Sequence, residues 1–214
     1  AMAGGRPEYL PVLIAAMRAI LDPELEHDKW QATSSSTFPV VIVNGPIARK
    51  IRLNSGFGLL GPDPQHPAGA SIGRAIRLLL QNVGGALPGV GTMSMYGGMR
   101  ATNAVFAEDE AGLPAGWSTV AMDHLGLARG TNAVTVFIAT SASNIVRRGV
   151  GKEAPDEEAL QSLHRVARYL ANPNANAPHG WAAGTPGGLL MSRVVAGQLA
   201  GLGWSKERIR NFLW

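Results

Sequence analysis

The chain has 214 residues, a length that fits one full domain and is short for two. Hydrophobic residues make up 46% of the chain and charged residues 16%, which excludes an intrinsically disordered protein and indicates a well-buried α/β or α+β core. The formal net charge is +4, but the basic residues are scattered and only 6% of the residues are aromatic, so we expect no nucleic-acid partner.

Cysteine is absent from the chain. Its absence excludes disulfides, thiolate metal ligands and a cysteine nucleophile, and it fits a reducing compartment. No apolar run reaches the roughly 18 residues that span a bilayer, and the N-terminus has no signal-peptide pattern. We therefore expect a soluble, cytoplasmic protein with no membrane partner.

The first predicted element is an amphipathic helix from Pro7 to Leu21, because apolar residues recur at helical spacing along it. The predicted core-facing stripe of this helix contains Leu10, Leu13, Ile14, Met17, Ile20 and Leu21. The next element is a strand from Phe38 to Val43, whose continuous apolar and β-branched run predicts burial on both faces. The turn Asn44-Gly45-Pro46 ends this strand.

A long loop rich in Gly, Pro and Asn connects this strand to a helix that Ser71 is predicted to cap. Loops of this length inside a compact domain are usually functional or disordered, and the composition here argues against disorder, so we interpret the loop as the site. At the helix start, Ser71 and Arg74 would offer a hydroxyl, free amides and a guanidinium to a carboxylate or phosphate. The candidate substrate-binding residues are Asn44, Asn54, Ser55, Ser71 and Arg74.

Two later strands and three later helices complete the prediction. The strands are expected at Thr102–Ala107 and Asn132–Thr140, and the helices begin at Asp156, about Leu189 and Ser205. The predicted fold is therefore a single α/β or α+β domain over residues 1–214, with a central sheet of buried strands flanked by helices and a long Gly/Pro-rich site loop.

The sequence from Gly56 to Gly61 matches the dinucleotide-binding pattern G-x-G-x-x-G. That pattern requires a helix directly after the glycines, whereas Pro62-Asp63-Pro64 follows here and cannot form a helix interior. We therefore reject this interpretation and expect no nucleotide cofactor.

The sequence from Gly69 to Gly73 matches G-x-S-x-G, the nucleophile elbow of α/β-hydrolases. Asp123, His124 and His179 follow in the order that a serine hydrolase requires. However, the segment before these glycines is a proline-interrupted loop, whereas the elbow follows a strand. A serine hydrolase that uses Ser71 is therefore an alternative and not the leading hypothesis.

Glu108, Asp109 and Glu110 follow the second predicted strand, a place where catalytic carboxylates often lie in α/β folds. We take Glu108 and Glu110 as candidate catalytic carboxylates and His124 as a candidate general base. A water-exposed acidic turn is the alternative interpretation. Either His66 or His124 could join Glu108 or Glu110 as a metal ligand or as a general base, so a bound metal ion is left open.

Several segments, taken together, resemble a known family. They read MAGGRPEYLPVL, VNGPIA, LNSG, SIGRAIRLLLQNVGG and GWSKERIRNFL, and they extend from Met2 to Leu213. In these segments the chain is similar to a little-characterised bacterial family that is named for a tetrapeptide of selenocysteine or cysteine followed by Gly-Ser-Cys. The string from Ser71 to Gly85 is the most specific part, and the resemblance also implies an acidic stretch at Glu108–Glu110.

The chain departs from this family in having no cysteine, so the tetrapeptide is absent and the redox role that it implies cannot be performed by this chain alone. Gly69-Ala70 also stands where the family resemblance implies Asn-Ala. The resemblance begins abruptly at Met2, which implies that the chain is one part or one subunit of a longer family polypeptide.

The leading hypothesis for function is an enzyme, or one subunit of an enzyme, that acts on a polar or anionic organic small molecule by hydrolytic or lyase-type acid/base chemistry. The alternative from a different class is a non-catalytic subunit that completes the redox or metal site of a partner chain. The low charge and apolar residues such as Met93, Met95, Met99 and Trp214 predict a homo- or hetero-oligomer.

Overall fold

The computed structural model describes residues 2–95, 97, 104–139, 155–170 and 188–213. The chain divides into two compact units: unit 1 contains Ala1–Glu110 and Ser118–Ala142, and unit 2 contains Ala111–Trp117 and Ser143–Trp214. Within the described residues, no helix combines the length and the apolar composition needed to cross a membrane. The single domain and the cytoplasmic location stay predictions.

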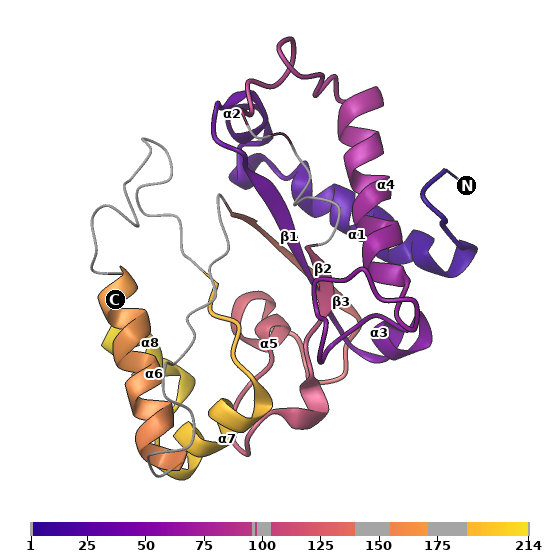
Figure 1. Cartoon of the computed structure of the whole chain (residues 1–214). Coiled ribbons are helices and arrows are strands. Elements are labelled where there is room, and N and C mark those ends of the chain that lie inside the picture. Colours follow the sequence, from indigo (N-terminus) through magenta and orange to yellow (C-terminus); the bar gives the residue numbers. More distant parts are fainter. Residues whose placement is uncertain (1, 96, 98–103, 140–154, 171–187, 214) are drawn as a thin grey trace. The chain divides into compact units, whose positions relative to one another are not determined.

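Unit 1 is built on a mixed β-sheet with the strand order β2-β1-β3 (Figure 1). Strand β1 (Phe38–Asn44) pairs in parallel with β2 (Val105–Ala107) and antiparallel with β3 (Ala133–Ala139). Helices flank this sheet, so the predicted mixed α/β class is confirmed. Strands β2 and β3 lie within the predicted ranges, of which residues 102, 103 and 140 lie outside the described residues, and β1 extends one residue further than predicted, to Asn44.

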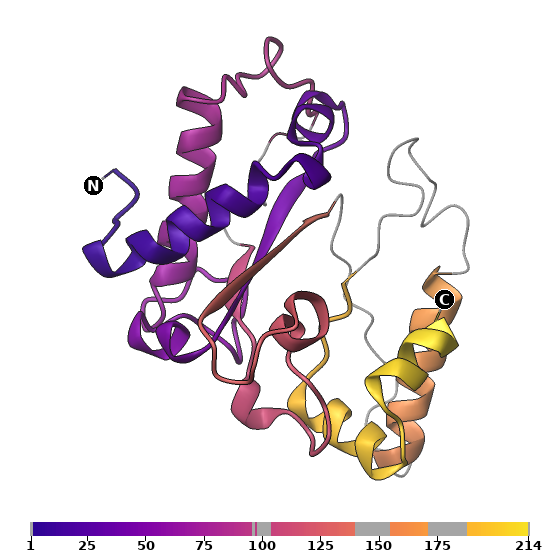
Figure 2. The same cartoon turned by 180° about the vertical axis from the view of Figure 1, so that it is seen from behind.

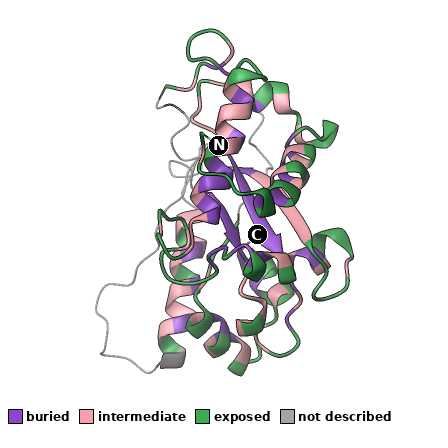
Figure 3. Cartoon of the chain, turned by 90° about the vertical axis from the view of Figure 1, so that its right-hand side faces the viewer, coloured by how far each residue is buried: buried purple, intermediate pink, exposed green. Residues whose placement is uncertain are grey.

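Strand β1 is the central strand, and each of its seven residues is buried. Buried positions, coloured purple, run through the strands at the centre of Figure 3. The β-branched run accounts for this burial, because a central strand that is covered on both faces presents no side to water. Strand β3 differs, since Ile138 is its one buried residue. Both β2 and β3 are edge strands of the described sheet, yet β2 is buried throughout, so the edge position alone does not account for the half-buried residues of β3.

Helix α1 (Leu10–Ile20) follows the 3-10 turn Pro7–Tyr9 and packs against β1, β3 and α4 (Figures 1 and 2). The predicted helix from Pro7 is therefore confirmed. The other helical segments between Pro23 and Leu125 are the 3-10 turn Pro23–Leu25, α2 (His27–Ala32), α3 (Pro46–Lys50), α4 (Ala68–Asn82), the 3-10 turn Glu110–Gly112 and α5 (Val120–Leu125).

The predicted core-facing stripe of α1 is correct for Ile20, which is buried, whereas Leu13 and Met17 are half-buried and the other three residues are exposed. The buried residues of this segment are Tyr9, Val12, Ala16 and Ile20. Leu10 and Ile14, which the pattern places in the core, are 52% and 51% exposed. The sequence of α1 is apolar on nearly every side, with Arg18 as its one charged residue, so the pattern does not identify the face that meets the sheet.

Helix α4 begins at Ala68 and not at Ser71. Ser71 is therefore not a helix cap, because Pro67 occupies the N-cap position and the N–H of Ser71 already donates to its carbonyl oxygen at 3.1 Å. Gly69 permits the earlier start: a Cβ there would lie 2.5 Å from the carbonyl oxygen of Val105, so only glycine lets this turn pack against β2. A contact with a distant strand thus sets the start of this helix.

The buried face of α4 agrees with the prediction over most of its length. Ile72, Ile76 and Leu80 are buried, and Leu79 is half-buried. Val83 lies beyond the last helical residue and is 82% exposed, so it does not extend this face.

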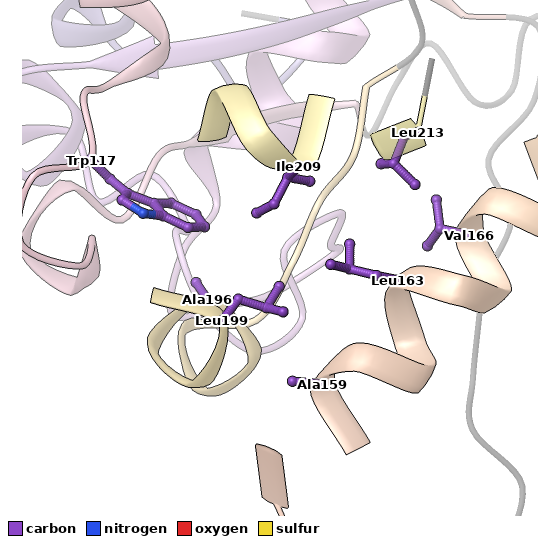
Figure 4. Close-up of a cluster of buried hydrophobic side chains, with 8 residues drawn as sticks. All are labelled: Trp117, Ala159, Leu163, Val166, Ala196, Leu199, Ile209 and Leu213. Atoms are coloured by element: carbon purple, nitrogen blue, oxygen red, sulfur yellow. The ribbon is translucent and has the colours of Figure 1, made fainter. Parts of the chain in front are cut away.

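Unit 2 contains three helices within its described residues: α6 (Pro155–Leu170), α7 (Arg193–Gly201) and α8 (Lys206–Leu213). Helix α7 starts later than the predicted Leu189, directly after its cap Ser192, whose hydroxyl accepts a hydrogen bond from the N–H of Val195. The side chains that form the core of unit 2 are Trp117, Ala159, Leu163, Val166, Ala196, Leu199, Ile209 and Leu213 (Figure 4). The indole N–H of Trp117 donates to the carbonyl oxygen of Trp204 at 3.3 Å, which satisfies a polar group within this core.

The turn from β1 into α3 depends on Gly45. Its backbone has a φ of +87° and a ψ of −179°, a region that glycine alone adopts readily. A Cβ at this position would lie 2.6 Å from the carbonyl oxygen of Thr131 and 2.7 Å from the backbone nitrogen of Asn132. The segment that leads into β3 therefore packs directly on the backbone of Gly45.

We predict that Gly45→Ala lowers the free energy of unfolding by about 3 kcal/mol or more, because backbone strain and a clash with backbone atoms act together. Gly130→Ala is the matched control: Gly130 has a φ of +81°, but a Cβ there would meet no atom within 4 Å. This control should lose only about 1–2 kcal/mol. Urea unfolding measures both variants, and equal losses would contradict this account of the turn.

Candidate functional site

Strand register places the candidate residues Asn44 and Glu108 next to each other. In the parallel pair of β1 and β2, Val43 is opposite Ala107, so Asn44 and Glu108 follow at the same edge of the sheet. Because side chains alternate between the two faces of a sheet, both residues continue the face that carries Ile42. In open α/β sheets, ligands bind at this carboxyl edge of the parallel strands.

A buried amide joins the two candidate catalytic carboxylates. Asn44 is 1% exposed, and its Nδ2 donates to Oε2 of Glu108 at 2.7 Å and to Oε1 of Glu110 at 3.2 Å. Oε1 of Glu110 also accepts a hydrogen bond from the backbone N–H of Gly45 at 2.5 Å. The Oδ1 atom of Asn44 is buried and has no hydrogen-bond partner among the described residues. An unsatisfied acceptor therefore lies beside two carboxylates.

Glu108 also has a structural role. Its Oε2 accepts a hydrogen bond at 2.8 Å from the backbone N–H of Val120, the first residue of α5. A carboxylate is favourable there, because the first N–H groups of a helix have no partner within the helix. Oε1 of Glu108 and Oε2 of Glu110 have no hydrogen-bond partner in the described part of the chain, and both side chains are half-buried. These two oxygens are available to a ligand.

Asn54, the second candidate amide, is buried and organises the loop that precedes α4. Its Oδ1 accepts a hydrogen bond from the N–H of Gly56 at 2.8 Å, and its Nδ2 donates to the carbonyl oxygen of Phe57 at 2.8 Å. Its own carbonyl oxygen accepts a hydrogen bond at 2.8 Å from the N–H of Ala107, the residue before Glu108. Asn54 therefore ties the loop to the carboxyl edge of β2.

The structure brings together an aspartate and a histidine that the sequence analysis did not pair. Nδ1 of His66 lies 2.5 Å from Oδ2 of Asp63, and Oδ1 of Asp63 accepts a hydrogen bond from the N–H of Gln65 at 2.8 Å. The contact with His66 lowers the pKa of Asp63 below its ordinary value, and the hydrogen bond from Gln65 lowers it further by a smaller amount. When Nδ1 donates to this carboxylate, Nε2 of a neutral imidazole carries the lone pair and can act as a base.

The pair of Asp63 and His66 belongs to the same loop network. Oδ2 of Asp63 lies 3.5 Å from Nδ2 of Asn54. The side chains of Asp63 and His66 are 23% and 39% exposed, so the imidazole is open to a ligand on one side. The sequence signal that could have identified the pair is the spacing in Asp-Pro-Gln-His, because residues three apart in a turn lie close together.

Four other candidate residues do not contribute to this network. Ser71 is buried in α4, and its hydroxyl has no hydrogen-bond partner among the described residues, so it does not present an exposed nucleophile. Arg74 is exposed on the same helix, and His124 is exposed near the end of α5. Ser55 is exposed in the loop. His179, the other candidate for a serine hydrolase, lies outside the described residues.

The described residues were searched for two kinds of cofactor site, a metal site and a dinucleotide site. Within the described residues, no group of three or more His, Cys, Asp or Glu side chains is arranged to hold a metal ion. The pattern from Gly56 to Gly61 lies in the loop, and α4 begins only at Ala68, so no helix follows these glycines directly. Cofactor binding stays open.

Comparison with known proteins finds no family model, no curated protein and no solved structure that matches the chain. The resemblance to the family with the Gly-Ser-Cys tetrapeptide therefore stays a prediction. Function is inferred from the geometry of the site.

We predict that Asn44→Asp destabilises the chain strongly at neutral pH, because it places a third carboxylate in a buried position beside Glu108 and Glu110. The free energy of unfolding should fall by about 3–5 kcal/mol at pH 7. Burial and like charges raise the folded-state pKa of the introduced carboxyl group above its unfolded value, so the loss should shrink as the pH falls and that group is protonated.

The control for this prediction is Asn82→Asp, since Asn82 is exposed at the end of α4. It should lower the free energy of unfolding by less than about 1 kcal/mol. Denaturant unfolding between neutral and acidic pH measures both variants. A loss in Asn44→Asp that does not change with pH would contradict the electrostatic account.

Proposed function

We propose that this chain is a small-molecule enzyme, or one subunit of such an enzyme, that binds a polar organic substrate at the carboxyl edge of β1 and β2. It acts on that substrate by hydrolytic or lyase-type acid/base chemistry. The proposal depends on one observation: the buried amide of Asn44 holds Glu108 and Glu110 together, while one oxygen of each carboxylate has no partner among the described residues. Acid/base catalysis requires such atoms within hydrogen-bond reach of the substrate.

The charge of this edge favours a substrate that donates hydrogen bonds. Carboxylates attract hydroxyl, amino and ammonium groups and repel anions. The expectation of an anionic substrate depends on Ser71 and Arg74, of which the first is buried and the second is exposed. Neither residue hydrogen-bonds to Glu108 or Glu110. A polar substrate that carries hydroxyl or amino groups is therefore the better supported choice.

His66 is the histidine that we propose as the general base of this site, in place of His124. Asp63 orients the imidazole, and the loop that holds both residues is tied to β2 through Asn54. His124 has no comparable carboxylate contact among the described residues. A base of this kind would take a proton from a substrate hydroxyl or from water.

A non-catalytic subunit and a serine hydrolase are the two alternative functions. A non-catalytic subunit would use Glu108 and Glu110 only to join β1, β2 and α5, and the hydrogen bonds would be the same. A serine hydrolase would need the hydroxyl of Ser71 to be accessible, and the burial of this residue does not favour that alternative.

Glutamine variants test the catalytic proposal. Glu108→Gln and Glu110→Gln keep the side-chain length and an acceptor for Asn44, but they remove the carboxylate that transfers a proton. In a panel of esters, amides, nitriles and hydroxy acids that carry hydroxyl or amino groups, we expect the purified chain to turn over at least one class. Each variant should lower kcat by about 10²-fold.

The control is Glu8→Gln, because Glu8 is an exposed carboxylate in the first 3-10 turn. Its kcat should equal that of the wild-type chain. Unchanged kcat in both Glu108→Gln and Glu110→Gln would contradict the proposal. No turnover of any class by the wild-type chain would favour the non-catalytic subunit.

We also propose that the chain associates with a second copy or with a different subunit. Large apolar residues with at least half of their surface exposed include Leu10 at 52%, Ile14 at 51%, Leu21 at 56%, Met93 at 52% and Met95 at 78%. The first three lie on or beside α1, and a helix that is apolar on all sides is normally covered on all sides. Met99 and Trp214 lie outside the described residues.

Light scattering of the purified chain at micromolar concentration tests this association. We expect a mass above the 22.4 kDa of one chain, or a complex when the chain is co-expressed with its genomic neighbours. Ile14→Glu should weaken the association, because it places a charge on the exposed apolar side of α1. Val194→Glu, at a position that is 65% exposed on α7, is the control. A monomer under both conditions would contradict the proposal.

A further inference from the structure

Helix α1 has a second apolar face besides the one that is buried in unit 1. The helix lies at the front of unit 1 in Figure 2. Large apolar residues follow one another along its outer side, from its first residue to the residue directly after its end. We call this set the outer seam, and its residues are Leu10, Ile14, Met17 and Leu21.

The outer seam has the spacing of a helix–helix contact. Its residues are four, three and four positions apart, which is the heptad spacing of the residues that meet in a coiled coil. Leu10, Ile14 and Leu21 are 52%, 51% and 56% exposed although α1 packs against β1, β3 and α4, and Met17 is half-buried. A folded domain rarely leaves a continuous apolar stripe in water, so the seam indicates contact with a further helix.

The two ends of the outer seam carry opposite charges. Arg6 lies four residues before Leu10, and Glu24 lies three residues after Leu21. Both charged side chains are exposed, and neither forms an ion pair with a described residue. Asp22, which is also exposed, adds a second negative charge at the same end as Glu24. A partner helix that runs in the opposite direction and has its own charges in the same order is complementary to both ends.

A second copy of this chain has these properties. When two copies of α1 pair antiparallel about a two-fold axis, Leu10 of one copy is opposite Leu21 of the other, and Ile14 is opposite Met17. In this register all four residues of each seam are covered by the seam of the other copy. A shift of the register would leave apolar residues exposed at both ends.

The charges favour the antiparallel direction over the parallel one. Antiparallel pairing places Arg6 of each copy near Glu24 of the other, whereas parallel pairing would bring like charges together at both ends. Glu8 shares a helix face with Val12, four residues further on, and not with the seam. The positive end of each helix dipole also lies near the negative end of the other.

We propose that two copies of this chain associate by antiparallel contact of their outer seams. The inference rests on the proposed association of the chain, and it names the partner and the surface. Stable interfaces of standard size bury about 800 Å² per partner, and four partly exposed side chains cover less than this. We therefore expect a weak dimer, with a dissociation constant of about 1–10 μM.

Light scattering of the purified full chain gives the first part of the test. At a concentration about tenfold above this dissociation constant, most of the chain should be dimeric, with a mass close to twice the 22.4 kDa of one copy.

Disulfide trapping gives the second part, because the chain has no cysteine of its own. The double variant Leu10→Cys/Leu21→Cys, oxidised in air with copper phenanthroline, should form a covalent dimer with two disulfides. Each single variant should form about tenfold less, because the two copies of one position lie about 16 Å apart along antiparallel helices, beyond the reach of a disulfide. The same distance prevents a bond within one copy.

The matched control is Leu10→Cys/Val194→Cys, which also has two thiols but places one of them on α7, at a position that is 65% exposed. This variant should form no more covalent dimer than Leu10→Cys alone. Circular dichroism of the reduced variants confirms that each is folded.

Three results would overturn the proposal. The first is a monomeric mass of the purified chain, and a complex with a different subunit alone would then leave the association intact but remove the second copy as its partner. The second is covalent dimer in the single variants at the level of the double variant, which would indicate parallel pairing. The third is no covalent dimer in the double variant. Seam residues form no hydrogen bond with Glu108 or Glu110, so these results are independent of the kcat measurements on the glutamine variants.

Discussion

Burial of the Asn44 side chain is the constraint on which the carboxyl edge of the sheet depends. A buried amide is destabilising unless its polar atoms have partners, and here Nδ2 finds them in Glu108 and Glu110. The two carboxylates are also held by the N–H groups of Gly45 and Val120. One side chain at the end of β1 thereby fixes the residues after β2, the turn into α3 and the start of α5.

The same hydrogen bonds explain how two carboxylates can lie close together. Each has a donor that is independent of the other, Val120 for Glu108 and Gly45 for Glu110, and both share the amide of Asn44. Donors that are fixed by strands and helix ends hold charged groups in position before a ligand arrives, which is what acid/base catalysis requires. Structural and catalytic roles are therefore compatible at this edge.

Local sequence patterns predicted the parts of the fold that depend on local properties. The β-branched run identified β1, and the position of Glu108 after a strand identified it as a candidate site residue. The contact between Asn44 and Glu108 depends on the parallel register of β1 and β2, which joins segments distant in sequence and has no local signal.

The wrong predictions have the same physical origin. The buried face of α1 was assigned only in part, with Ile20 correct and Leu10 and Ile14 wrong, because the helix is apolar on nearly every side. Ser71 was taken for a cap because the close approach of Gly69 to Val105 is not visible in the sequence. The spacing of Asp63 and His66, in contrast, was a local signal that could have been used.

The central claim is that the carboxyl edge of β1 and β2 binds a hydrogen-bond-donating small molecule. An amide ¹H–¹⁵N spectrum of the full chain, recorded with a library of small polyols and amines, tests it most directly. We expect the ligands that bind to change the amide chemical shifts of Gly45 and Val120, whose N–H groups contact the carboxylates. In Glu108→Gln the same ligands should no longer change these chemical shifts. Binding that shifts amides elsewhere and leaves these two unchanged would contradict the claim.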